Sequence, residues 1–334
     1  MNRYWRIATI TGVWGYVALV FVLFLLLWLA ADRWWLATVA LFGPLHLLLF
    51  PLLLLFPAAF YQQRILLLPL AVAALLLVFG VLDFRLHWNA DSQKSDKSLR
   101  VLTLNVGPPD LDAATCMMLI EEYQPDVIVL QEKDTDDALK SLQGWNVLQR
   151  EHLALVSRFP LREVGFTQRD YPPTPWPQVD ALVADMETPQ GPIRVCTVHL
   201  RTPRDGISEV LSRRTIIAPW RRAAVEAEID IRDHECRKVS GWLRSMPSTD
   251  FIAGDFNMPV GSHLYRRYWS IYDNAFSMAG LGFGLSKVSS AAGIRFGSRI
   301  DHILYSDRWQ AISCRVGADM GSDHRPVIAD LALR

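Results

Sequence analysis

The sequence predicts a domain of the α/β or α+β class carried on three transmembrane helices. Two observations predict this organisation. Three long apolar runs lie within the first 82 residues of the 334-residue chain, and each is about long enough to cross a bilayer. Beyond residue 98, short apolar runs typical of strands alternate with amphipathic patterns typical of helices. We therefore divide the chain into a membrane region (1–88), a polar linker (89–98) and a soluble domain (99–334).

The membrane region is predicted to contain spans at about 7–31, 36–60 and 65–82. The first run is uncharged and exceeds the roughly 7–15 apolar residues of a cleaved signal peptide, so we expect it to be retained. Three prolines interrupt the second run, which is therefore expected to be kinked or re-entrant. His46, the one ionisable residue of that run, is interpreted as a structural group bonded to a neighbouring helix.

Three spans place the N-terminus and the soluble domain on opposite sides of the membrane. The short tail before the first span carries Arg3 and Arg6, and short basic segments tend to remain in the cytoplasm. The other charges near the spans favour the reverse placement, so the cytoplasmic alternative stays open. On the evidence of the tail we expect the domain to lie outside the cytoplasm, joined by a linker that lets it explore tens of ångströms.

The charge of the soluble part lowers the expectation of a nucleic-acid partner. Beyond Lys97 the chain has 27 basic and 30 acidic residues, whereas a domain that grips long nucleic acid usually carries a basic excess.

The four cysteines lie far apart without a CxxC pair, so they indicate ordinary thiols and leave the compartment undecided. No HExxH, GxSxG or P-loop pattern occurs, which disfavours zinc and serine hydrolases.

Polar clusters follow the strand-like runs of the soluble domain. The runs read RVLTLNVG, DVIVLQE, IRVCTVHL, DFIAGDFN, SRIDHILYS and GSDHRPVIADL, and helical periodicity appears over Leu111–Tyr123 and Ala223–Ser245. One such cluster is weak evidence, because a polar residue after a strand is often a turn or cap residue. Together and in this order they resemble the endonuclease/exonuclease/phosphatase superfamily, the DNase I-like proteins. The resemblance implies an α+β four-layer α/β/β/α sandwich with an active site at one edge of its two sheets.

Carboxylates in this set suit a divalent cation. Hydrolysis of a phosphoester needs a cation on the phosphoryl oxygens, an activated water and donors for the developing charge. The resemblance assigns metal binding to Glu132 with Asn105 beside it, and Asp323 fits a position near the metal. Oxygen ligands of this kind favour Mg²⁺, with Mn²⁺ as the alternative.

The remaining motif residues are expected to perform the chemistry. Asp255 and Asn257 are two residues apart and project from one side of an extended chain; the resemblance makes Asp255 the water-activating group and Asn257 a donor to the phosphoryl oxygen. Asp301 is expected to orient the ring of His324 and favour its charged form. His199 resembles the second histidine of the superfamily, which donates to the phosphoryl group.

Three further features flank these motifs. His302 follows Asp301 directly and faces the opposite side of its strand, so we interpret it as structural. Arg201 and Arg204 are candidates for binding additional substrate phosphate, with solvated surface charges as the equal alternative. The basic amphipathic segment 205–222 suits contact with an anionic bilayer, or a surface helix packed on the domain.

The arrangement of three helices before such a domain resembles bacterial membrane phosphatases of the teicoplanin-resistance type. This resemblance implies an integral protein of the bacterial inner membrane whose partners are the lipid bilayer and a lipid-linked phosphate or pyrophosphate. A metal-dependent nuclease is the alternative within the fold, because one scaffold serves many phosphoesters. A membrane protein that kept the fold without catalysis is the alternative outside it.

Overall fold

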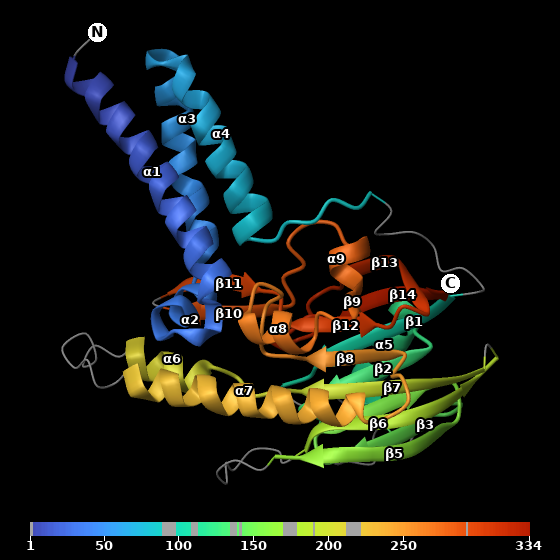
Figure 1. Ribbon diagram of the computed structural model, residues 1–334. Coiled ribbons are helices and arrows are strands. Elements are labelled where there is room, and N and C mark those ends of the chain that lie inside the picture. The colour runs from blue at the N-terminus through green and yellow to red at the C-terminus, as the bar shows by residue number, and fades with distance from the viewer. Residues whose placement is uncertain are drawn as a thin grey trace.

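The computed structural model consists of a column of apolar helices standing on a layered domain (Figure 1). It describes residues 3–88, 98–107, 113–133, 139, 142–169, 179–189, 191–211, 222–291 and 293–334. The predicted linker, apart from Ser98, therefore lies outside the described residues, as does most of the C-terminal half of the 205–222 segment.

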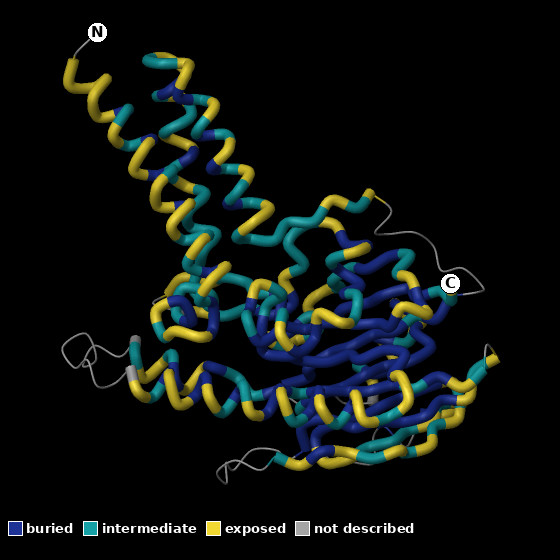
Figure 2. The backbone as a smooth tube through the Cα atoms, viewed as in Figure 1, coloured by how far each residue is buried: buried dark blue, intermediate teal, exposed yellow. Residues whose placement is uncertain are grey.

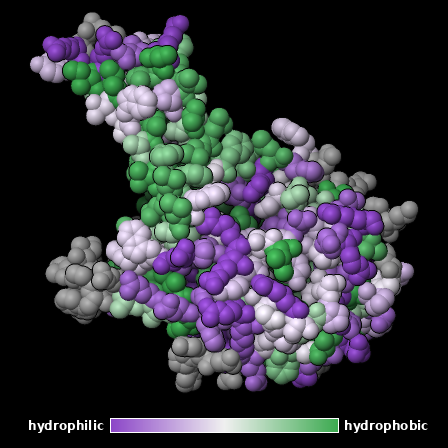
Figure 3. Space-filling view, viewed as in Figure 1, coloured by the Kyte–Doolittle hydropathy of each residue, from purple (hydrophilic) through white to green (hydrophobic). Residues whose placement is uncertain are grey.

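Three helical stretches of the column are long and apolar enough to cross a membrane, as predicted: Arg3–Leu29, Leu45–Gln62 and Arg64–Val81. They are built from α1 (Arg3–Leu29), α3 (Phe50–Gln62), α4 (Leu67–Leu75), the 3-10 helices η2 (Leu45–Leu49) and η3 (Arg64–Leu66), and the π-helix η4 (Leu76–Val81). Their mutual contact is a small core that includes Val13, Val20, Leu70 and Leu77. Apolar side chains cover the outside of the column, and hydrophilic ones gather at its far end (Figure 3).

The second predicted span, 36–60, is broken near its start, at the first of the three prolines that interrupt it. The short helix α2 (Trp35–Leu41) ends before Gly43 and Pro44, and the crossing stretch begins only at Leu45. Proline cannot donate a helical hydrogen bond and disfavours helix in the residue before it, so this pair breaks the run. As a result α2 lies near the domain, in contact with η1 (Ala31–Arg33) and α7 (Arg222–Arg244), and η1 in turn contacts α8 (His263–Tyr268).

Two six-stranded mixed sheets form the centre of the domain. The first has the order β13-β14-β1-β2-β4-β3, with β1 (Ser98–Asn105), β2 (Val127–Gln131), β3 (Asn146–Arg150), β4 (Leu153–Ser157), β13 (Trp309–Val316) and β14 (Val327–Leu333). The second has the order β5-β6-β7-β8-β12-β9, with β5 (Leu161–Gln168), β6 (Val179–Thr188), β7 (Gly191–His199), β8 (Phe251–Asp255), β9 (Asp273–Asn274) and β12 (Asp301–Tyr305). A separate hairpin joins β10 (Lys287–Ala291) to β11 (Ile294–Ser298).

Helices cover the outer faces of both sheets, which confirms the predicted four-layer α+β sandwich. The inner faces meet in one apolar core that contains Val101 and Val129 from the first sheet and Val195 and Phe251 from the second. On the outside, α5 (Ala113–Tyr123) packs on the first sheet and α7 (Arg222–Arg244) on the second. The central strands of both sheets are almost wholly buried, whereas the edge strands β3 and β5 are partly exposed (Figure 2). The short helix α9 (Ala275–Ala279) packs on β13, and α6 (Arg204–Leu211) packs on α7.

Each sheet contains one parallel pair, and this positions the site. β1 runs parallel to β2, and β7 runs parallel to β8. Polar residues at the carboxyl ends of such pairs therefore lie side by side: His199 is in register with Asp255, and Asp255 is also in register with Asp301 on the antiparallel strand β12. Residues opposite one another in paired strands project to the same face.

The membrane region is docked on the domain, which corrects the expectation of a loosely tethered one. Asp32, in the turn after α1, accepts hydrogen bonds from Ser262 Oγ at 2.5 Å and His263 N at 2.6 Å. After the last span, Asp83 forms an ion pair with Arg299. These contacts fix the domain directly beneath the helical column and do not depend on the linker.

Candidate active site

The site continues the apolar core between the two sheets. Side chains alternate along a strand, so the inward row of β1 passes through Val101 and Thr103 to Asn105, and that of β8 passes through Phe251 and Ala253 to Asp255. Asn105 Nδ2 bridges the sheets by donating to Asp255 Oδ2 at 3.0 Å and to Glu132 Oε1 at 2.9 Å. The buried amide thus gives both carboxylates a hydrogen-bond donor, which offsets part of the cost of burying them.

Oxygen atoms converge around Gly107, just beyond β1. Gly107 and Glu132 both have left-handed backbone, with φ of 50° and 55°. A Cβ on Gly107 would lie 3.7 Å from Asp323 Oδ1 and 4.0 Å from Glu132 Oε2, and Gly107 N donates to Asn105 Oδ1 at 3.1 Å. The Glu132 and Asp323 side chains are 32% and 52% exposed. This all-oxygen, solvent-accessible donor set fits a hard divalent cation that keeps several waters.

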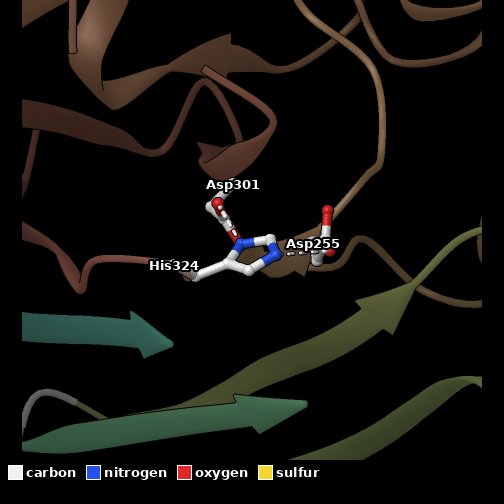
Figure 4. Close-up of side chains that lie close together, drawn as sticks. All are labelled: Asp255, Asp301 and His324. Atoms are coloured by element: carbon white, nitrogen blue, oxygen red, sulfur yellow. Dashed lines mark hydrogen bonds and ion pairs between the residues drawn. The ribbon is translucent and has the colours of Figure 1, made fainter. Parts of the chain in front are cut away.

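His324 and Asp301 form the buried pair that the sequence predicts (Figure 4). The Nδ1 atom of His324 lies 2.9 and 3.0 Å from the two carboxylate oxygens of Asp301, and Nε2 lies 3.6 Å from Asp255 Oδ2. Burial alone would lower the pKa of His324, but the adjacent charges of Asp301 and Asp255 outweigh it and raise this pKa above its usual value. The geometry therefore favours an imidazolium.

Asp255 lies at the centre of the cluster. Burial, followed by the negative charge of Asp301, raises the pKa of Asp255 to about 7, and a carboxylate with such a pKa suits a general base at neutral pH. Asp255, Asp301 and His324 also each offer one ligand atom within 4.8 Å of one another. A cation could therefore bind here too, although the hydrogen bond between His324 and Asp301 already engages both side chains.

Asn257 turns back toward Asp255. Its backbone is left-handed, with φ of 51°, and its N–H donates to Asp255 Oδ1 at 2.8 Å. Its side-chain Nδ2 lies 2.8 Å from the Leu200 carbonyl and 3.2 Å from Asp255 Oδ2. The amide predicted to meet a phosphoryl oxygen is therefore beside the cluster, where protein acceptors engage it.

His199 completes the second-sheet side of the site. Its Nε2 lies 3.5 Å from Glu132 Oε1 and 3.9 Å from Asp255 Oδ2. Burial, with positive charge nearby, holds the pKa of His199 well below its usual value, so the ring is neutral at physiological pH. The ring of His152 is tilted against that of His199, with 5.1 Å between the centroids. His152 lies in no sequence motif; it immediately precedes β4, and its carbonyl accepts from Lys133 N after β2.

Lys287 is a site residue that sequence reasoning missed. It begins β10, pairs across a β-bridge with His324 and forms an ion pair with Asp323. Burial alone would raise the pKa of Asp323, but the adjacent ammonium of Lys287 outweighs burial and lowers this pKa. Gly293, with φ of 80°, fits a turn between the two strands, but no local signal places the first residue of that hairpin against the SDH motif.

The two candidate arginines have different surroundings. Arg201 forms an ion pair with Glu228 at 2.5 Å, so its side chain is held within the protein. Arg204 is exposed and lines a cavity beside the site. His302 is buried on the outer face of its strand, with Nε2 2.9 Å from the Met258 carbonyl, which matches a structural position.

A cavity of about 1170 Å³ joins the site to the membrane region. One wall is apolar and comes from α1 and the α2–η2 turn, including Leu23, Val39 and Leu45. The opposite wall belongs to the domain and includes Arg204, Asn257, Lys287 and Asp323. The cavity therefore has an apolar side at the helical column and a polar side at the candidate active site.

Comparisons with known proteins identify the domain. A model of the Endonuclease/Exonuclease/phosphatase family matches residues 86–324, most of the chain. The chain belongs to the endonuclease/exonuclease/phosphatase family. This confirms the resemblance drawn from the motifs. No curated protein sequence gives a significant match.

Solved structures share the fold of this family member. A variant of the 3′ phosphatase NExo from Neisseria, bound to a product DNA hairpin, has a TM-score of 0.51 and 19% identity, covering 69% of this chain and 98% of its own. D. rerio TDP2 with a single-stranded DNA product has a TM-score of 0.50 and 14% identity, covering 71% and 99%. An endonuclease/exonuclease/phosphatase from Bacteroides vulgatus has a TM-score of 0.50 and 15% identity, also covering 71% and 99%. Identities this low establish the fold alone.

Gly254 is predicted to be essential for placing Asp255. Its φ is 147°, and a Cβ there would lie 2.0 Å from the Val198 carbonyl oxygen of the paired strand. Since neither backbone can yield, Gly254→Ala should destabilise the protein by about 3 kcal/mol or more. The midpoint of thermal unfolding should fall by more than about 5 °C.

Gly241→Ala is the matched control, because Gly241 lies in α7 with no atom within 4 Å of its added Cβ. Alanine favours helix, so this variant should unfold at the wild-type temperature or slightly above it. A Gly254→Ala protein as stable as wild type would contradict the assigned backbone geometry.

Proposed function

We propose that this protein is a membrane-anchored, divalent-metal-dependent phosphoesterase that hydrolyses a lipid-linked phosphate ester or pyrophosphate. The cavity between the membrane helices and the candidate active site carries the proposal. Its apolar wall, which includes Leu19, Leu23 and Leu48, suits a hydrocarbon chain, whose burial is favourable by about 0.8 kcal/mol per methylene. Its polar wall suits the anionic headgroup at the other end of the same molecule.

The residues of this chain divide the chemistry between them. Water attacks phosphorus and gives its proton to Asp255, whose raised pKa of about 7 suits a base near neutral pH. As the new P–O bond forms, the P–O bond to the leaving alcohol or phosphate breaks, and that group takes up a proton from solvent. The imidazolium of His324, held by Asp301 at 2.9 Å, donates to a phosphoryl oxygen as negative charge develops, while the Asn257 backbone N–H holds Asp255 at 2.8 Å. Lys287 and Arg204 at the cavity wall supply further positive charge.

Glu132, Asp323 and the Asn105 carbonyl are the residues that would hold the cation. Bound Mg²⁺ or Mn²⁺ would act as a Lewis acid on a phosphoryl oxygen. The deeper group of Asp255, Asp301 and His324 is better suited to proton transfer, since its members already form hydrogen bonds with one another or with Asn105.

A nuclease is the alternative function. Two similar structures contain DNA products, but their identity to this chain is 19% or less. The slight acidic excess of the soluble part argues against general attraction to polyanions. The arrangement of three spans before the domain, which resembles the teicoplanin-resistance membrane phosphatases, also favours a lipid substrate.

We further propose that the domain lies outside the cytoplasm of a bacterial inner membrane. The three helices place the N-terminus at the end of the column remote from the domain (Figure 1). The basic N-terminal tail, with Arg3 and Arg6, supports a cytoplasmic N-terminus.

Catalysis is predicted to require both a divalent cation and Asp255. Full-length protein in detergent should hydrolyse a soluble chromogenic phosphoester with Mg²⁺, lose activity in EDTA and recover it with Mg²⁺ or Mn²⁺. Asp255→Asn should lower kcat by about 10²- to 10⁴-fold, because the base is lost. Its thermal midpoint should not fall, since a buried charge that faces Asp301 is removed. Asp307→Asn, at an exposed turn, is the control for this substitution and should keep the wild-type kcat. In the EDTA experiment, activity that survives complete chelation would exclude the metal mechanism.

Lipid-linked phosphates are predicted to be the preferred substrates. A panel of polyprenyl pyrophosphate, phospholipids, sphingomyelin and plasmid DNA should show hydrolysis of a lipid. Leu23→Trp narrows the apolar wall, so kcat/KM for that lipid should fall by about tenfold or more, while the soluble ester is turned over normally. Leu53→Trp, at a 70% exposed position on the outside of the column, should change neither. Efficient DNA cleavage with every lipid untouched would replace this function with the nuclease alternative.

Labelling of introduced cysteines tests the predicted orientation. The four native cysteines are buried, so an introduced cysteine reports on its own position. Asp307→Cys, on the domain, should react with a membrane-impermeant maleimide in intact bacterial spheroplasts. Tyr4→Cys, at an exposed position at the opposite end of the column that leaves both tail arginines in place, should react only after lysis. The reverse pattern would place the domain in the cytoplasm.

A further inference from the structure

A buried arginine joins two loops of the candidate active site. Arg232 lies within α7, and its side chain is 1% exposed. Its Nη2 donates to the Asn257 carbonyl at 2.8 Å, and its Nε donates to the Arg201 carbonyl at 3.1 Å. The first carbonyl belongs to the turn after β8, and the second to the loop after β7 that forms part of the cavity wall. Arg232 therefore sets the separation of these loops.

The counter-charge of Arg232 comes from the membrane region. The Asp32 carboxylate is fully buried and lies 3.8 Å from Arg232 Nη1, which makes no hydrogen bond within the described part of the chain. No other carboxylate among the described residues forms an ion pair with Arg232. The guanidinium also lies over the ring of Phe42, 5.5 Å from its centroid. A buried charge without a counter-charge is costly, so the position of Arg232 depends on residues outside the domain.

Asp32 also fixes the chain that leaves the active site. Besides Ser262 and His263, it accepts from the backbone N–H of Leu264 at 3.3 Å. Asn257 lies only five residues before Ser262 and has a left-handed backbone, φ 51°, which asparagine adopts more readily than most residues. Asp32 thus restrains this segment at one end directly and at the other through Arg232.

We propose that Asp32 and Arg232 are a positioning pair, through which the membrane region sets the position of Asn257 and of the loop that begins at Arg201. The membrane helices are then a structural part of the active site in addition to an anchor. The inference goes beyond the proposed function, because it applies to any substrate, including one without a lipid chain.

The test uses Asp32→Asn in the full-length protein in detergent. Asparagine keeps the shape and one acceptor oxygen of Asp32 but removes the charge that faces Arg232. With Mg²⁺ and a soluble chromogenic phosphodiester, kcat should fall by about tenfold or more, because small displacements of reacting groups are costly, while KM stays within about twofold. Hydrogen–deuterium exchange of peptides covering residues 251–264 should become faster.

Arg266→Ala is the matched control, because it removes another contact between α8 and the membrane region. Arg266 Nη2 donates to the Trp28 carbonyl at 2.8 Å and does not touch Arg232. This variant should keep the wild-type kcat and exchange. In an Arg232→Met background, Asp32→Asn should cause no further loss, since the charge it served is gone.

Two results would overturn the proposal: wild-type kcat and exchange in Asp32→Asn, or equal changes in Asp32→Asn and Arg266→Ala. The second would assign the effect to docking in general. If the wild-type protein hydrolyses no phosphoester, the proposed function fails, and the exchange of residues 251–264 still decides this inference.

Discussion

The site depends on side-chain alternation in strands whose inner faces form the core. The inward rows of β1, β7 and β8 end in Asn105, His199 and Asp255, and the inward row of β12 begins with Asp301. At the edge of an apolar core such groups have few partners except one another, and an unpaired buried polar group is costly. Hydrogen bonds from Asn105 and His324 satisfy the buried carboxylates, so the need for partners largely determines the geometry.

The same constraint explains why the backbone turns sharply where the strands end. Glu132 and Asn257 both have positive φ, and Gly254 lets β8 approach the Val198 carbonyl more closely than any side chain would allow. Conformations of this kind persist only when neighbouring contacts impose them. Here the contacts come from both sheets, from α7 through Arg232, and from the membrane region through Asp32. Local strain at the site is therefore balanced by tertiary contacts that reach into the helical column.

Local sequence was sufficient for the strands that carry the motifs and for most of the residues that the structure gathers at the candidate site. A motif such as AGDFN combines a strand, its end and its polar residues within a few positions, and the parallel pairing then brings His199 and Asp255 together. Lys287 could not be found this way, because its contact with Asp323 depends on how a separate hairpin folds back on the chain. Pro44 indicated the break in the second span, but nothing in the local sequence indicated that a short helix would lie beside the domain.

The docking of the domain was also beyond the reach of local sequence. Asp32 and Asp83 are single charges in short connectors, and such charges usually face water or the headgroup region. Only the folded chain shows that Asp32 binds the start of α8 and that Asp83 pairs with Arg299. From composition alone, the polar linker is expected to determine how the domain is held, and such a linker suggests a mobile tether.

Under the proposed function, docking makes the shape of the cavity, in addition to closeness to the membrane, a reason to favour a lipid substrate. A flexible tether raises the local concentration of every phosphate at the membrane surface equally, so it gives proximity without selectivity. A fixed cavity, with Leu23 and Val39 on one wall and Asn257 and Lys287 on the other, would favour a molecule that has both an apolar chain and an anionic headgroup. Under the proposed function, selectivity then comes from a shape that neither the helices nor the domain forms alone. Since Asp32 fixes the relation between these two walls, the residue that holds the domain in place also maintains the shape on which that selectivity depends.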